Sequence, residues 1–367
     1  MKKKLISLLT AFSMTLMLLT GVPISVSAEV VASGNCGKYT DEDITWSLDS
    51  SGVLTISGEG EMKKFTFDDN APWKGSNVKR VIIESGVTTI GEEAFHGCSE
   101  LVSVEIPNTV THIKRCAFME CHKLKLDRLP ESVWYIESQA FQGCYSLETL
   151  DLPGVYTIEY AAFEGCSTGQ VSDMDITLCT GLRAVNMPEA VYISDSAFSR
   201  CFNLETVNAP KVKVLNAVFQ HCRMLTSVYI PSVKTIKRYA FNDCYRLLSF
   251  EIPPNVKVES KAFYGMSSSV IYYHESCTVQ PDSFPNVRAE VKYTVTDGET
   301  ELEIVKAGNY SHVNFPETIG GGKVVSANWE EFLTDDYPKR ELTHDGEHNA
   351  DENMICRICG NDSGEHK

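Results

Sequence analysis

Phenylalanine recurs along most of this 367-residue chain at a nearly constant interval, in all but one case directly after alanine. An interval near 22 residues is typical of solenoids, in which each repeat forms one coil and stacks on the next. The chain is therefore expected to form an elongated stack rather than a set of globular domains. The recurring residues, 23, 23, 22, 35, 21, 22 and 22 positions apart, are Phe95, Phe118, Phe141, Phe163, Phe198, Phe219, Phe241 and Phe263.

The clearest repeat unit is VTTIGEEAFHGCSELVSVEIP, from Val87 to Pro107. Ala94, Cys98 and Leu101 lie four and three residues apart, which predicts a short helical turn. The following VSVEIP alternates apolar and polar residues, which predicts a strand with one buried face. Neither element could bury its apolar side alone. We therefore predict an α/β leucine-rich-repeat solenoid of about eight coils of 21 to 23 residues.

Two units depart from the pattern. The 35-residue interval holds STGQVSDMDITLCTG, from Ser167 to Gly181, which we interpret as a 13-residue insertion looped out of the fourth coil. In the second coil, Asp127 stands where Val104 of the first coil points inward, and Leu126 comes one place early. A shift of register or a bulge is expected at that strand.

The pattern I-x3-A-F-x2-C-x2-L-x2-V-x-I-P resembles that of the BspA-type leucine-rich-repeat proteins. The resemblance covers Val87 to about Met266, and Met266 replaces the cysteine in the last unit. Upstream, Cys36 to Met62 is similar to the β-rich cap that often precedes such arrays. The resemblance implies a secreted or surface protein of gut or oral bacteria with a role in adhesion to host matrix or other cells. The motif itself contains no binding residues that could be transferred to this chain.

Five segments are expected. Residues 1–28 form a secretory signal peptide, because Lys2 to Lys4 precede the apolar run Leu5 to Leu19 and the small-residue exit Val26-Ser27-Ala28. Residues 29–80 form an N-terminal β-hairpin cap, and residues 81–275 form the solenoid. Residues 276–337 form a small β domain, with a hairpin turn at Asp297-Gly298. Residues 338–367 form a polar tail rich in cysteine and histidine.

Charge and motifs narrow the possible functions. The formal net charge is −16, and it becomes −19 once the three signal lysines are removed, which disfavours nucleic acid as a partner. No transmembrane segment is expected in the mature chain, and a monomer is expected. Phosphate loops, nucleophile elbows and dinucleotide fingerprints do not occur in the sequence, so we expect a non-catalytic extracellular protein.

Thirteen cysteines in a secreted chain first suggest disulfides. Seven of them, however, occupy the same place in successive coils, so their side chains should point in parallel into the core and not toward one another. We favour a ladder of buried thiols over bridges between coils. Cys116, just before an Ala-Phe pair, is expected to be more exposed. The seven are Cys98, Cys121, Cys144, Cys166, Cys201, Cys222 and Cys244.

The tail HDGEHNADENMICRICG contains the one set of residues suited to a metal. His344, His348, Cys356 and Cys359 are of the type that binds tetrahedral zinc. A disulfide within the Cys-x2-Cys pair, or free thiols, are the alternatives.

Two surfaces are candidates for binding an extracellular protein or glycan. The first is a column of outward strand residues, which should line up when coils stack and which suits a polar or basic partner. The second is a patch of aromatic residues, which offers stacking contacts unless its rings merely pack together. A structural module without a tight ligand is the alternative function. The column comprises Glu105, Arg128, Asp151, Asn186, Asn208, Tyr229 and Glu251, and the patch comprises Trp134, Tyr135, Tyr156 and Tyr192.

Overall fold

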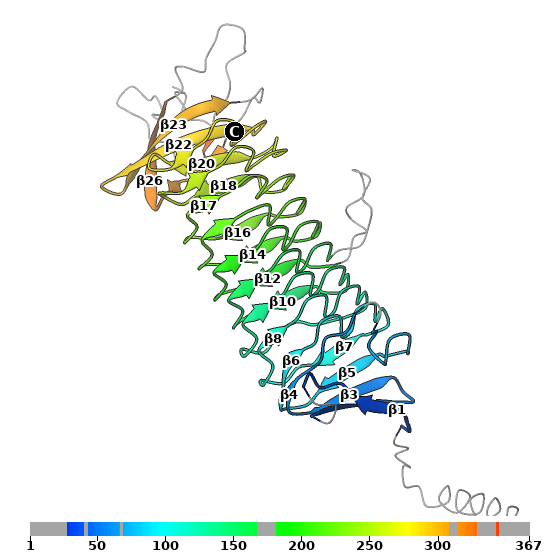
Figure 1. The fold of residues 1–367 in the computed structure, drawn as a ribbon. Coiled ribbons are helices and arrows are strands. Elements are labelled where there is room, and N and C mark those ends of the chain that lie inside the picture. The colour runs from blue at the N-terminus through cyan, green and yellow to red at the C-terminus, as the bar shows by residue number, and fades with distance from the viewer. Residues whose placement is uncertain are drawn as a thin grey trace, which may run out of the picture.

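The computed structural model describes residues 28–39, 43–66, 69–166, 181–307, 314–328 and 343–344. They form a long rod of stacked coils (Figure 1). The predicted signal peptide, nearly all of the fourth-coil insertion and nearly all of the polar tail lie outside the described residues. Each regular coil contributes one short strand to each of two faces of the rod, so the leucine-rich-repeat solenoid is confirmed.

The first face contains the strands formed by the V-x-I-P segments. Its strands within the coils pair in parallel, each with the equivalent residues of the next coil, for example Val185 with Val207. In chain order the strands are β1 (Val30–Asn35), β2 (Ile44–Asp49), β3 (Val53–Gly58), β5 (Arg80–Ile83), β7 (Ser103–Glu105), β10 (Thr149–Asp151), β12 (Ala184–Asn186), β14 (Thr206–Asn208), β16 (Ser227–Tyr229), β18 (Ser249–Ile252), β20 (Val270–His274), β22 (Ala289–Thr296), β23 (Glu299–Ala307), β25 (Thr318–Ile319) and β26 (Gly322–Asn328).

The second face contains shorter strands, most of which end in a fully buried aliphatic residue such as Ile136 or Ile158. These strands also pair in parallel from coil to coil. They are β4 (Gly60–Glu61), β6 (Val87–Ile90), β8 (His112–Ile113), β9 (Tyr135–Ile136), β11 (Thr157–Ile158), β13 (Tyr192–Ile193), β15 (Val214–Leu215), β17 (Thr235–Ile236), β19 (Lys257–Val258) and β21 (Thr278–Val279). A separate pair joins β24 (Asn314–Phe315) to β27 (Thr343–His344).

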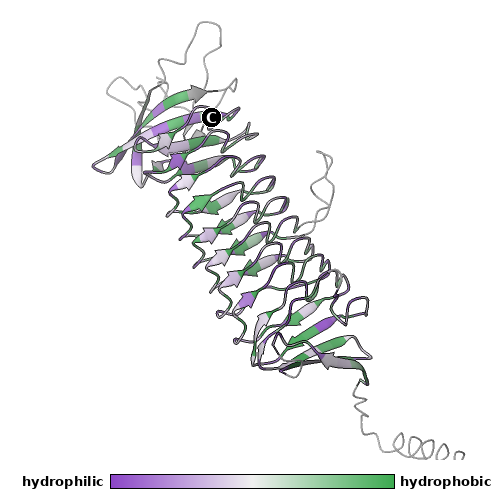
Figure 2. Cartoon of the chain, viewed as in Figure 1, coloured by the Kyte–Doolittle hydropathy of each residue, from purple (hydrophilic) through white to green (hydrophobic). Residues whose placement is uncertain are grey.

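A continuous stack of aromatic rings fills the core between the two faces. All eight phenylalanines of the repeat are fully buried, and neighbouring rings lie nearly parallel, as at Phe141 and Phe163, whose centroids are 5.2 Å apart. The stack extends one coil beyond the eight predicted coils at each end, to Trp73 and to Phe284. Ten coils therefore share the core, and Figure 2 shows hydrophobic residues recurring from coil to coil along the array.

The predicted helical turn is wrong, and the α/β class with it, because the described residues contain strands and turns but no helix. Residues two before each phenylalanine adopt a left-handed backbone, as at Glu93 with φ 55° and Gln139 with φ 60°, which interrupts any helix. The Phe95 amide then donates to the carbonyl of Ala117 in the next coil at 2.8 Å. Bonds between coils thus replace bonds along a helix.

The two ends of the array are closed by antiparallel strands. At the N-terminal end β2 and β3 pair around the turn at Asp49 and Gly52, and β3 then pairs in parallel with β5 of the array. At the other end β22 and β23 form a hairpin at Asp297-Gly298. Since β22 also pairs in parallel with β20, this terminal hairpin belongs to the same sheet as the last coils.

The second coil is irregular, as predicted, but its first-face strand is lost and not merely shifted or bulged. Residues 106–148 are all described, and none of them forms a strand on the first face; a single bridge joins Arg128 to Asp151. Leu126 is half-buried while Leu129 is fully buried. The displaced Leu126 explains the break, because its early position moves Asp127 outward.

The thiol ladder is present, with hydrogen bonds that the sequence did not indicate. Six of the seven thiols are fully buried, and the first, Cys98, is half-buried. Each of the six donates to the carbonyl of the phenylalanine in the preceding coil, as Cys144 Sγ does to Phe118 O at 3.1 Å. Burial raises the pKa of the Cys98 thiol to about 11 and that of Cys144 well above its usual range. These two thiols therefore remain protonated at neutral pH.

Replacing Cys144 with serine is expected to lower the free energy of unfolding by about 1–3 kcal/mol. The shorter C–O bond moves the donor away from Phe118 O and leaves space where sulfur packed. Urea denaturation measures the loss.

Thiols of the native protein should also resist alkylation. A mapped bridge between Cys98 and Cys121 would contradict the parallel arrangement.

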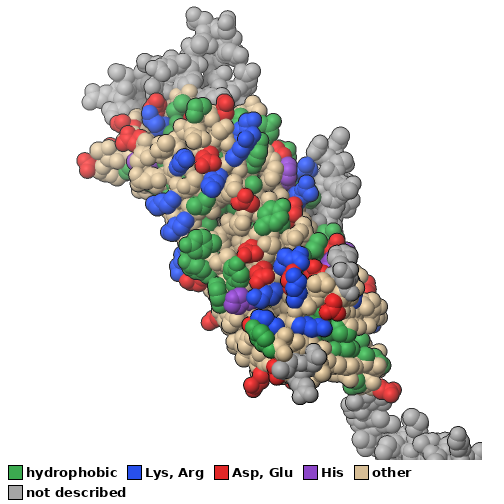
Figure 3. All heavy atoms as spheres, in the orientation of Figure 1, with side chains coloured by type: hydrophobic (Ala, Val, Ile, Leu, Met, Phe, Trp, Pro, Cys, Tyr) green, Lys and Arg blue, Asp and Glu red, His purple; other side chains and the backbone are tan. Residues whose placement is uncertain are grey.

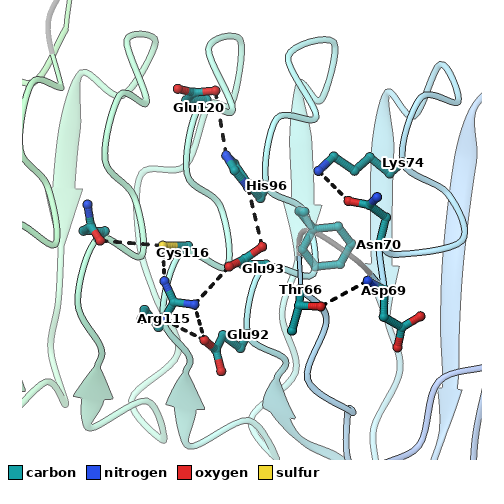
Figure 4. A network of polar contacts seen from close by, with 12 residues as sticks. Thr66, Asp69, Asn70, Lys74, Glu92, Glu93, His96, Arg115, Cys116 and Glu120 are labelled. Carbon is teal, nitrogen blue, oxygen red and sulfur yellow. Dashed lines mark hydrogen bonds and ion pairs between the residues drawn. The ribbon is translucent and has the colours of Figure 1, made fainter.

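The prediction that Cys116 is exposed is wrong, because only 4% of its surface is exposed. Arg115 lies against it, with Nη1 3.4 Å from the Cys116 sulfur. The guanidinium is held there by Glu92, which accepts from Nε at 2.6 Å, and by Glu93, which accepts from Nη2 at 2.9 Å (Figure 4). A charged network between coils thus shields a residue that its position in the repeat placed at the surface.

Candidate binding faces

The predicted polar column follows the first face. Asp151, Asn186, Asn208 and Tyr229 occupy equivalent, paired positions on β10, β12, β14 and β16. Arg128 extends the column by its bridge to Asp151. Stacking places these side chains one coil apart, a separation of about 4.8 Å.

Side-chain hydrogen bonds run along the column. The Asn208 amide donates to Asn186 Oδ1 at 2.6 Å, and the Asn186 amide donates to Asp151 Oδ1 at 2.7 Å. Arg128 binds the other Asp151 oxygen. This chain fixes the orientation of both amides, and each Nδ2 still has a second hydrogen to donate. Tyr229 lies next to Asn208 in the following coil, and 59% of its surface is exposed.

An open groove of about 390 Å³ runs beside this column. The groove is lined by Asp151, Asn186, Asn208 and Tyr229. It is also lined, among other residues, by the second outward-facing residue of each of the same strands. Those positions were missed by the sequence reasoning, although they are the first residue of each x-V-x strand. They carry small, mostly hydroxyl-bearing side chains, namely Thr149, Ala184, Thr206 and Ser227. A second hollow of about 560 Å³ lies where the first face is broken, beside Arg128.

The ends of the predicted column are engaged by neighbouring residues. Glu105 forms an ion pair with Arg80. Glu251 accepts from the Tyr293 hydroxyl at 3.2 Å and from the Gly320 amide at 3.1 Å. All three carboxylates of the column therefore have partners, which leaves the amides and Tyr229 as its available groups.

The predicted aromatic patch lies on the second face. Trp134, Tyr156 and Tyr192 are 44%, 42% and 60% exposed, and Tyr135 is half-buried. Tyr156 and Tyr192 meet edge to face with centroids 5.4 Å apart, and Trp134 packs on His112 at 4.6 Å. A hydrogen bond to Glu159 raises the pKa of the Tyr135 hydroxyl to about 12. The rings pack in small groups and still present surface to solvent.

Three of the four predicted zinc ligands lie outside the described residues. Backbone placement is given for His344, in β27, and His348, Cys356 and Cys359 fall beyond the described residues. Zinc binding stays a hypothesis that metal analysis of the wild type and of Cys356→Ser would check. Within the described ranges, no group of three or more histidine, cysteine, aspartate or glutamate residues is arranged to hold a metal ion. Over the same ranges, no helix has the length and hydropathy of a membrane span.

The stacked coils, the buried ring and thiol ladders and the parallel faces define a leucine-rich-repeat solenoid. Residues 66–177 and 177–289 match the family profile described as BspA type leucine rich repeat region, in six copies. The chain belongs to this family, as its repeat pattern predicted. No curated protein matches it.

Solved structures with a similar fold are also leucine-rich-repeat proteins. One, from T. pallidum, is 24% identical, with 57% of this chain and 90% of that chain covered and a TM-score of 0.41. Another, described as a leucine rich cell surface protein from Faecalibacterium prausnitzii A2-165, is 19% identical, with 71% and 95% covered and a TM-score of 0.30.

Proposed function

We propose that this protein is a secreted, adhesin-like binding protein that presents the polar column of its first face to an extracellular protein or glycan. The observation that carries the proposal is the hydrogen-bonded chain from Arg128 through Asp151 and Asn186 to Asn208, beside an open groove. Side chains held in place before binding lose less conformational entropy when a ligand arrives. An ordered row of amides at the surface is therefore well suited to recognition.

The character of the groove favours an uncharged polar ligand. The sequence suggested a polar or basic partner, but Asp151 is neutralised by Arg128, and Glu105 and Glu251 are also engaged. What remains is a set of amides and hydroxyls that both donate and accept hydrogen bonds. Such a set fits hydroxyl-rich sugars or the neutral polar surface of a protein.

Secretion is part of the same proposal. It rests on the basic, apolar and small-residue order of positions 1–28, and N-terminal sequencing of the protein from the culture medium tests it. A start near Glu29 supports release, and an uncleaved chain retained in cells contradicts it.

Binding itself is tested by screening the full chain against immobilised neutral glycans and extracellular matrix proteins. The proposal expects at least one saturable ligand. If the protein is instead a purely structural module, no saturable ligand is expected. Repeated absence of binding across such arrays therefore favours that alternative.

A further inference from the structure

The second face carries a row of exposed side chains that begins with aromatic rings and continues with lysines. Trp134, Tyr156, Lys213 and Lys234 each stand just before a short strand, and Tyr192 and Lys257 stand one residue further along, as the first residues of β13 and β19. Backbone bonds link its members from coil to coil: Tyr156 N donates to Trp134 O at 2.9 Å, and Lys234 N donates to Lys213 O at 2.8 Å. Lys257 N in turn donates to Lys234 O at 2.9 Å. We call Lys213, Lys234 and Lys257 the lysine column, and together with the aromatic patch they form one lane.

The lysine column is unusual in a chain of net charge −16. All three lysines are exposed. Within the described part of the chain, neither Lys213 nor Lys234 forms an ion pair, and Lys257 meets Glu259 of its own coil at 3.6 Å. Glu189, a nearby acid, is taken by Lys211 at 2.5 Å. Like charges one coil apart repel one another, so a bound anion would lower the electrostatic energy of the lysine column.

The aromatic half of the lane differs in charge from the lysine half. Trp134, Tyr156 and Tyr192 offer exposed ring surface on neighbouring coils. Lys114, which directly follows β8 on the same face, is engaged by Glu137 at 3.2 Å. Along the left edge of the rod, Figure 3 shows Lys and Arg side chains beside the place of β17 in Figure 1, next to a hydrophobic cluster with further Lys or Arg side chains beyond it.

We propose that this lane binds an anionic polysaccharide. Aromatic rings pack against the apolar faces of sugar rings, and ammonium groups pair with carboxylate or sulfate groups. Repeating sugar units can follow side chains that repeat once per coil. The site lies on the opposite set of strands from the groove of the proposed function and does not depend on it.

The separation of rings and cations decides between a polysaccharide and single-stranded nucleic acid. Nucleic acid carries a phosphate beside every base, so its binding sites place cations beside the stacking rings. Here Trp134 and Tyr156 precede Val191 along the row, and the unpaired Lys213 and Lys234 follow it. A polymer with both uncharged and charged ring units matches this order better, and the acidic character of the whole chain further disfavours nucleic acid.

The test measures binding of the full chain to dextran sulfate and polygalacturonate. Unmodified dextran, a single-stranded oligonucleotide and vesicles of anionic phospholipid serve as comparison probes. We expect binding to both acidic polysaccharides that weakens as salt is raised from about 50 mM to about 300 mM. The triple variant Lys213→Gln, Lys234→Gln and Lys257→Gln should bind about tenfold more weakly. The double variant Trp134→Ala and Tyr156→Ala should also bind about tenfold more weakly, and this loss should persist at high salt.

A matched control removes three lysines from other surfaces, each of which has an ion pair there. Lys64→Gln, Lys123→Gln and Lys292→Gln change the net charge equally and should leave binding within about twofold of the wild type. The proposal is overturned if neither acidic polysaccharide binds, if the control triple loses as much affinity, or if the oligonucleotide or the vesicles bind more tightly. None of these outcomes bears on the groove.

Discussion

Replacing Phe163 with alanine is expected to lower the free energy of unfolding by about 3–5 kcal/mol. The Phe163 side chain is fully buried in the middle of the ring stack. Its ring lies 5.2 Å from that of Phe141 and 5.1 Å from that of Phe198, nearly parallel to both. The substitution leaves a cavity and removes two ring contacts, and neighbouring coils cannot close the space without breaking their own pairing.

Urea denaturation of the variant measures this loss, with Tyr160→Ala as the matched control. Tyr160 lies three residues earlier in the same coil and is 52% exposed, so its removal should change stability by about 0.5 kcal/mol or less. Similar losses from the two substitutions would show that the ring stack does not hold the coils together.

Replacing Trp73 with alanine is expected to cost a similar amount, about 3–5 kcal/mol, with the effect concentrated at the N-terminal end. Trp73 is fully buried and stacks on Phe95 at 5.9 Å. It also meets Trp46 of β2 edge to face at 5.5 Å, and its Nε1 donates to Ala94 O at 2.7 Å. One side chain therefore joins the cap to the first coil.

Hydrogen exchange of the amides in β2 and β3 reports this effect locally. The amides should exchange faster in Trp73→Ala, while those of β14 and β16 should be unchanged, because coils interact mainly with their neighbours. Trp73→Phe keeps a ring in the stack and loses the indole hydrogen bond, so it should cost about 1–2 kcal/mol. Equal protection of β2 in all three proteins would refute this role for Trp73.

The repeat determined most of the fold that could be predicted. A period near 22 residues requires stacked coils, and equivalent positions in stacked coils must point the same way, which gave the thiol ladder and the polar column. The two end coils were not predicted, because Pro72-Trp73 and Ser283-Phe284 replace the Ala-Phe pair there. Their spacing of 22 and 21 residues from Phe95 and Phe263 was the available signal.

The helical turn was predicted because spacings of three and four residues also suit a series of tight turns. The turns are set by left-handed residues such as Glu93 and Gln139, and no glycine marks those positions in the sequence. The cover over Cys116 depends on Arg115 meeting Glu92 and Glu93 from the preceding coil. Such partners are 22 or 23 residues apart, and only the register between coils brings them together.

The binding surfaces were predictable to different degrees. Outward strand positions gave the polar column, but the engagement of Glu251 by Tyr293 and Gly320 depends on how the terminal strands fold over the last coils. The lysine column was hidden by the acidic composition, because net charge does not show where charges gather. Lys213 and Lys234 precede strands of the second face and Lys257 begins one, and the repeat motif leaves these positions unspecified.

The central claim is that the polar column of the first face binds the ligand, and one comparison tests it most directly. Wild-type protein, Asn208→Ala with Tyr229→Ala, and Trp134→Ala with Tyr156→Ala are screened in parallel on the same arrays of neutral glycans and matrix proteins, with circular dichroism confirming that all three are folded. We predict a ligand whose binding falls about tenfold or more in the first variant and is kept in the second. Loss in the second variant alone would contradict the claim and place the site on the aromatic patch.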